Sequence, residues 1–93
     1  MTPEPTLQAL LVEDDARLAA LTREYLGGHG VAVEVVSDGR RGLQEALRGG
    51  WDVVLLDLML PGLGGLEVCR ELRTRSDVPV IVLTARGEEL LVT

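Results

Sequence analysis

Acidic side chains and one hydroxyl group stand directly after three apolar runs of this sequence. They are Glu13-Asp14-Asp15 after Leu7–Val12, Asp57 after Asp52–Leu56, and Thr84 after Val80–Leu83. If the three runs are parallel strands of one sheet, their carboxyl ends share an edge, which is where such sheets bind ligands. Carboxylates gathered at that edge repel one another unless a cation compensates them. Mg²⁺ suits such a site, because this hard ion binds carboxylate, carbonyl, water and phosphate oxygens.

Each of these residues also has a purely structural explanation. Acidic residues after a strand often interact favourably with the amino end of the next helix. Asp57 could cap a helix or lie in a solvated loop, and Thr84 could be an ordinary β-branched strand residue. The occurrence of all three at the carboxyl ends of apolar runs favours a functional cluster over three unrelated structural roles.

Helical patterns lie between the apolar runs. Three stretches repeat apolar residues at helical spacing, and a further run, Val31–Val36, has the composition of a strand. The apolar positions are Leu18, Leu21, Tyr25 and Leu26 in the first stretch, Leu43, Ala46 and Leu47 in the second, and the inward-facing Leu66, Cys69 and Leu72 in the third. Ser37 or Asp38 is the expected cap of the second helix. The order βαβαβαβ predicts an α/β fold, an open parallel sheet with helices on both faces.

Length and composition limit the remaining possibilities. The 93 residues can form one small domain, and their net charge of −6 disfavours nucleic acid and anionic membranes as partners. All nine basic residues are arginine, so lysine chemistry is excluded within this chain. The single cysteine, Cys69, cannot form an internal disulfide, and no basic leader or long apolar run is present, so we expect a cytoplasmic location. We expect residues 1–6 to be a flexible N-terminus.

The segments ALLVEDD, DVVLLDLMLPGLGGLEV and VPVIVLTARGEE resemble the receiver domain of two-component response regulators. The resemblance covers residues 7–89 and is greatest to the branch that carries a winged-helix DNA-binding domain. It implies a flavodoxin-like doubly wound parallel sheet with the strand order 2-1-3-4. It also implies a sensor histidine kinase as phosphodonor, and a phosphoacceptor that supports self-phosphorylation and self-dephosphorylation without being an enzyme.

The resemblance assigns roles to individual residues. Asp57 would be the phosphoacceptor and Thr84 the switch hydroxyl that moves to bond the phosphoryl group. Glu13 and Asp14 would organise Mg²⁺, Asp14 as a direct ligand and Glu13 largely through water. Asp57 and the backbone carbonyl of Met59 would complete the protein ligands. In addition, Met59 and Arg86 occupy the variable positions that tune dephosphorylation in the family.

The sequence departs from the family at its C-terminal end. A complete receiver has a fifth strand whose lysine pairs with the phosphoryl group, and this chain contains no lysine. We therefore expect residues 1–93 to form one truncated receiver with four strands and three or four helices. Residues 86–93 would begin a fourth helix or lie extended. Because Leu90-Leu91-Val92-Thr93 resembles the apolar run of the missing strand, an internal deletion is an alternative to a simple stop.

An open strand edge follows from that truncation. Val80–Leu83 would present an unpaired row of hydrogen-bonding groups, and such edges recruit partner strands. We therefore predict a homodimer or a swapped assembly, with this strand or the C-terminal tail at the contact.

Three functions are compatible with these features of the sequence. The first is a phosphorylatable, Mg²⁺-binding receiver, impaired in switching because the lysine and the output face are absent. The second is a non-phosphorylated pseudo-receiver that acts as a dimerisation or protein-interaction module. The third, an aspartate-nucleophile phosphohydrolase, is disfavoured because that family places a second aspartate two residues after the nucleophile, where this chain has Met59. The glycines at 62, 64 and 65 indicate a tight loop and a helix start rather than a dinucleotide site.

Overall fold

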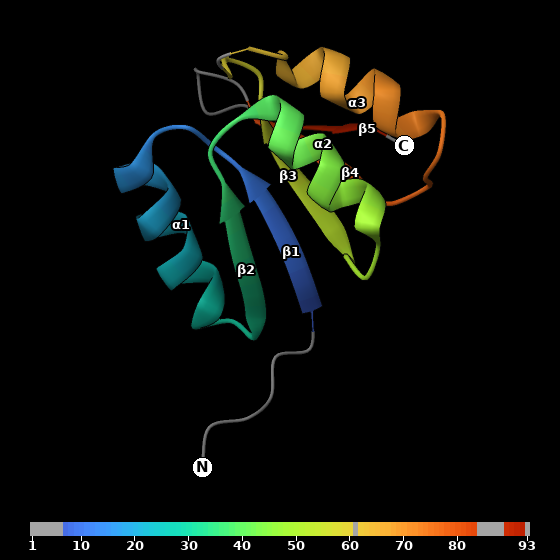
Figure 1. Ribbon diagram of the computed structural model, residues 1–93. Coiled ribbons are helices and arrows are strands. Elements are labelled where there is room, and N and C mark those ends of the chain that lie inside the picture. The colour runs from blue at the N-terminus through green and yellow to red at the C-terminus, as the bar shows by residue number, and fades with distance from the viewer. Residues whose placement is uncertain (1–6, 61, 84–88, 93) are drawn as a thin grey trace.

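A five-stranded sheet forms the centre of the molecule (Figure 1). The computed structural model describes residues 7–60 and 62–83 together with the backbone of residues 89–92. The strands follow the order β2-β1-β3-β4-β5 across the sheet. Their bounds are Leu7–Val12 (β1), Val31–Val36 (β2), Val53–Asp57 (β3), Val80–Leu83 (β4) and Glu89–Val92 (β5). Residues 1–6 lie outside the described part of the chain.

The first four strands are parallel, which confirms the predicted order 2-1-3-4. Leu10 to Val12 and Val54 to Leu56 are buried, because both faces of these central strands are covered in the way that parallel sheets require. Val12 pairs with Leu56, and Asp57 pairs with Leu83. The carboxyl ends of β1, β3 and β4 therefore lie at one edge of the sheet.

The fifth strand corrects the expectation of a four-stranded sheet with an open edge at Val80–Leu83. β5 pairs antiparallel with β4, and Leu83 lies opposite Glu89. Residues 89–92 are thus extended, which is one of the two conformations expected for the tail. The pairing satisfies the row of backbone groups that would otherwise have recruited a partner strand.

Three helices cover the two faces of the sheet. α1 (Ala16–Gly27) packs on one face, and α2 (Gly39–Arg48) and α3 (Gly65–Arg73) pack together on the other (Figure 1). The α2/α3 side carries the larger buried cluster, built around Leu10, Leu56 and Leu72. No helix in the described part of the chain has the length and apolar composition needed to span a bilayer.

The apolar stripes of the helices are buried to different extents. The second stripe packs on the core as predicted, and so do Cys69 and Leu72 of the third. Leu66 does not face inward as predicted: it is 60% exposed, and Val68 is the residue of the first turn of α3 that packs into the core.

Most of the predicted stripe of α1 is exposed, and of its four residues only Leu26 packs against the smaller core cluster. Leu21 and Tyr25 are 56% and 68% exposed, and Ala19 is the buried residue of this helix. These two side chains line a hollow of about 540 Å³ together with Leu55, Ile81 and others of the same face.

Candidate functional site

The connection between β1 and α1 is short and fixed at both ends. The amide of Glu13 donates to the carbonyl of Val36 at 2.9 Å, which extends the pairing with β2 by one residue. Asp15 caps α1, since its side chain accepts a hydrogen bond from the amide of Leu18 at 3.0 Å. The structural explanation of the acidic run therefore holds for Asp15, while Glu13 and Asp14 remain available at the edge of the sheet.

Asp57 is the last residue of β3 and lies between β1 and β4. The next amide, that of Leu58, donates to the carbonyl of Leu83 at 3.1 Å and so continues the pairing with β4. The amide of Met59 donates to Oδ1 of Asp57, also at 3.1 Å, and orients the carboxylate. Asp57 is half-buried, and its carboxylate lies at the edge of the sheet beside Glu13 and Asp14.

Three carboxylates meet at this edge. Glu13, Asp14 and Asp57 each offer one oxygen, and these oxygens all lie within 4.8 Å of one another. Oxygens that share one Mg²⁺ at about 2.1 Å lie roughly 3 to 4 Å apart, so small side-chain rotations bring the three into a common coordination sphere. Three oxygen ligands of this kind match the preference of Mg²⁺ for carboxylates, and the residues therefore fit the ion.

Burial and like charge act together on Glu13. This residue is only 4% exposed, and burial raises the pKa of its carboxyl group to about 7. The hydrogen bond from the Asp15 amide opposes that rise, whereas Asp57 and Asp14 add to it. A carboxyl group with this pKa is only partly ionised near neutral pH, because burial and the neighbouring carboxylates destabilise its ionised form. A cation bound in the cluster would offset that destabilisation.

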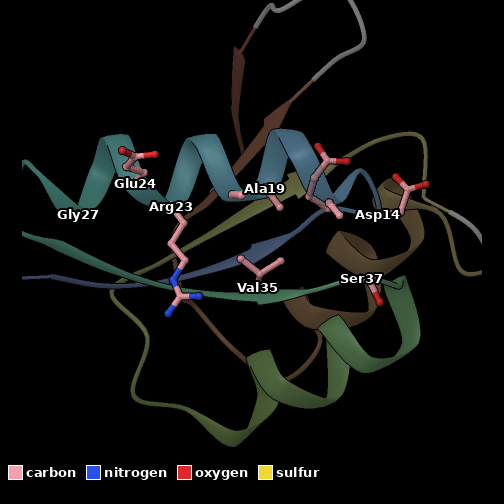
Figure 2. A pocket seen from close by; sticks show the side chains of 10 residues that line it. Asp14, Ala19, Arg23, Glu24, Gly27, Val35 and Ser37 are labelled. Carbon is pink, nitrogen blue, oxygen red and sulfur yellow. The ribbon is translucent and has the colours of Figure 1, made fainter.

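An elongated hollow leads away from the cluster along α1. It measures about 620 Å³ and runs between α1 and β2, the outermost strand on that side. Figure 2 shows Asp14 and Ser37 at one end of the hollow and Arg23 extending from α1 toward β2. Small residues such as Ala19 keep the hollow open. The acidic cluster is thus reached from the protein surface.

The other predicted site residues have different outcomes. Thr84 and Arg86 lie outside the described residues. Met59 lies next to the cluster through its amide, and its side chain is 71% exposed. Two residues for which the sequence predicted only structural roles lie at the site: Ser37 follows β2 as the acidic residues follow β1, and Gly65 packs on the backbone of Asp57. The end of the strand Val31–Val36 was the signal that could have identified Ser37.

The sequence matches the response regulator receiver domain over residues 9–93. This chain belongs to the receiver domain family. The chain is 51% identical over 81 residues to the sensory transduction protein RegX3 of Mycobacterium bovis, an alignment that covers 87% of this chain and 36% of RegX3. The receiver thus spans about a third of the length of that curated relative.

Two solved structures share the fold of this receiver. One is the receiver domain of a sensor histidine kinase from Pseudomonas aeruginosa, solved with a magnesium ion coordinated in its active site cleft. It has a TM-score of 0.81 and 35% identity, over 85% of this chain and 67% of that chain. The other is the complex of the histidine kinase ThkA with the response regulator TrrA of Thermotoga maritima. There the TM-score is 0.82 and the identity 32%, over 89% of this chain and 72% of that chain.

Proposed function

We propose that this receiver accepts a phosphoryl group on Asp57 from a sensor histidine kinase in a Mg²⁺-dependent reaction. The observation that carries the proposal is the convergence of three carboxylate oxygens within 4.8 Å, at the carboxyl ends of β1 and β3. The relatives support it: one similar receiver holds magnesium in its active site cleft, and another similar structure contains a histidine kinase with its response regulator.

The residues have distinct parts in this reaction. The free oxygen of Asp57 attacks the phosphorus of a phosphohistidine; an O–P bond forms, the N–P bond breaks, and the imidazole leaves with the electron pair and takes up a proton. The Met59 amide holds the other oxygen of Asp57 and thereby directs the attacking one. Glu13, Asp14 and Asp57, with the Met59 carbonyl, would hold Mg²⁺, Glu13 largely through water. The bound ion would neutralise the charge that spreads over the transferring oxygens.

The product of this reaction is the protein phosphorylated on Asp57. We propose that Thr84 then bonds the phosphoryl group as the switch hydroxyl, and that Met59 and Arg86 set the rate of dephosphorylation. The 93 residues contain no lysine. An arginine side chain and the bound Mg²⁺ would therefore have to compensate the charge of the phosphoryl group. A planar guanidinium group does not reproduce the point charge of a lysine, and we therefore propose that switching is impaired in this chain.

A phosphorylation assay tests the proposal. The metal-stripped protein is incubated with a small-molecule phosphodonor, with and without Mg²⁺, and its intact mass is measured next to that of Asp57→Asn. We expect one phosphoryl group to be added only when Mg²⁺ is present, and none to the variant. No gain by the wild-type protein at millimolar Mg²⁺, together with no Mg²⁺ binding by calorimetry, would reject the function.

The alternative is a pseudo-receiver that binds Mg²⁺ and is not phosphorylated. Its supporting observations are the missing lysine and the exposed apolar residues around Leu21 and Tyr25, which suit a contact with a second copy of this chain. Mg²⁺ binding without a mass gain, combined with a dimer by light scattering at micromolar concentration, would favour this function. A well-folded monomer would contradict this dimer.

Three further properties of the domain are its extent, its class of partner and its compartment. We propose that residues 1–93 act as one receiver unit, that their partners are proteins rather than nucleic acid or membrane, and that they act in the cytoplasm. The net charge of −6 supports the partner class, and the single cysteine supports the compartment.

A further inference from the structure

The first residue of α3 lies directly on the backbone of the phosphoacceptor strand. A Cβ atom at Gly65 would overlap the carbonyl oxygen of Asp57, and it would lie 2.9 Å from Cα of Leu58 and 3.1 Å from the carbonyl carbon of Asp57. All three are backbone atoms, so no side-chain rotation could make room. Glycine is therefore required at this position for α3 to begin where it does.

A second glycine holds the same loop from the other helix. A Cβ atom at Gly39, the first residue of α2, would overlap the carbonyl oxygen of Leu63 and lie 2.9 Å from its carbonyl carbon. Leu63 belongs to the β3–α3 loop, which follows Asp57 and precedes Gly65 and of which the structure describes residues 58–60 and 62–64. The first residue of α3 thus contacts the N-terminal end of this loop, and the first residue of α2 contacts its C-terminal end.

The part of the loop between these two contacts includes the atoms that matter for the site. The amide of Met59 donates to the Asp57 carboxylate at 3.1 Å, and the carbonyl of the same residue is the proposed Mg²⁺ ligand. A displacement of the peptide between Asp57 and Leu58 would move both. The neighbouring Gly64 differs, since a Cβ atom there would meet nothing within 4 Å.

We propose that Gly65 and Gly39 are positioning residues, which clamp the β3–α3 loop so that the Asp57 carboxylate and the Met59 peptide are held in the geometry that binds Mg²⁺. This inference rests on the proposed function. A Cβ atom at Gly65 has to push the Asp57 carbonyl oxygen away by about 1 Å to reach an ordinary contact. Changes in the groups that orient metal ligands typically cost 10–100-fold in metal affinity, and we expect a loss of about that size.

The test compares the alanine variants G65A and G39A with G64A, which is the matched control one residue away. Mg²⁺ affinity is measured by calorimetry on metal-stripped protein, and the hydrogen exchange and amide shift of Met59 are measured by NMR without metal. We expect G65A and G39A to bind Mg²⁺ about 10–100-fold more weakly and to exchange the Met59 amide faster, whereas G64A should match the wild type.

A stability control distinguishes a specific effect on the Mg²⁺ site from a general loss of folding stability. V33A removes two methyl groups from the core on the α1 side, away from the loop, and it should lower stability without a change in Mg²⁺ affinity. The inference is overturned if folded G65A and G39A bind Mg²⁺ within twofold of G64A, or if V33A weakens binding as much as they do. It is also overturned if neither glycine variant folds in a stabilising osmolyte, since a clamp that sets geometry must be separable from folding. Absence of Mg²⁺ binding by the wild type would instead reject the proposed function.

Discussion

Glu13 is in a position where its ionisation opposes folding. Its ordinary pKa is 4.5, and in the folded protein the pKa rises to about 7 because the carboxyl group is buried beside other acids. Below pH 4.5 the group is protonated in both states and has no effect. As the pH rises from 4.5 to 7, the unfolded chain loses this proton first, so the free energy of unfolding of the metal-free protein falls through that window and stays lower above it.

The size of this effect follows from the pKa difference. A rise from 4.5 to about 7 corresponds to about 3 kcal/mol at most. For a domain of this size, each kcal/mol changes the Tm by about 4–8 °C, so the effect on the Tm is at most roughly 12–24 °C. Glu13→Gln removes the titrating group and keeps an oxygen that can accept the hydrogen bond from the Asp15 amide.

The assay is thermal or urea-induced unfolding between pH 4 and 8 in the presence of a chelator, for the wild type, Glu13→Gln and the exposed control Glu24→Gln. We expect the Glu13 variant to gain stability over the wild type as the pH rises, up to the stated limit, and the Glu24 variant to follow the wild type. Millimolar Mg²⁺ at pH 7 to 8 should restore the wild type, because it binds the ionised form, and should affect the Glu13 variant less. Parallel pH profiles of the wild type and Glu13→Gln would refute the reasoning.

Three further variants test the site and the core. Asp14→Asn should weaken Mg²⁺ binding in calorimetry and raise the Tm of the metal-free protein, because it removes one of three clustered charges; an unchanged affinity would contradict its role. Asp15→Ala should cost about 1 kcal/mol in urea unfolding through loss of the α1 cap, and weaker Mg²⁺ binding would show that it does more than cap. Leu72→Ala, at a fully buried position, should cost about 2–5 kcal/mol in the same assay, and a loss below 1 kcal/mol would mean that the α2/α3 core is not packed as described.

Much of the fold could be predicted because its central strands, β1 and β3, are buried on both faces over most of their length. A run such as Leu7–Val12 has no polar alternation, and that property alone indicates a covered parallel sheet. The α1 stripe shows the limit of the same reasoning. Leu21 and Tyr25 follow helical spacing, but spacing identifies the apolar face of a helix and says nothing about how much of the sheet lies beneath it. An extended tail was one of the two conformations expected for the C-terminal residues, but its antiparallel pairing with β4 was not predicted from the sequence.

The candidate site was predictable where its residues are fixed by strand ends. Glu13, Asp14 and Asp57 meet because parallel neighbours in register bring their carboxyl ends together. The raised pKa of Glu13 was not predictable, since it depends on burial that only the packed structure defines. Gly65 was interpreted as part of a tight loop, and its contact with the Asp57 backbone required knowledge of where α3 begins.

The strands that carry the acidic residues are neighbours in the sheet, yet two helices and β2 separate them along the chain. No local fragment can bring the carboxylates together; they approach one another only when β3 docks on β1. Contacts between distant segments tend to form late in folding, so the mutual repulsion of these acids should be largely absent from the transition state. A divalent cation should therefore slow the unfolding of the chain far more than it accelerates its folding.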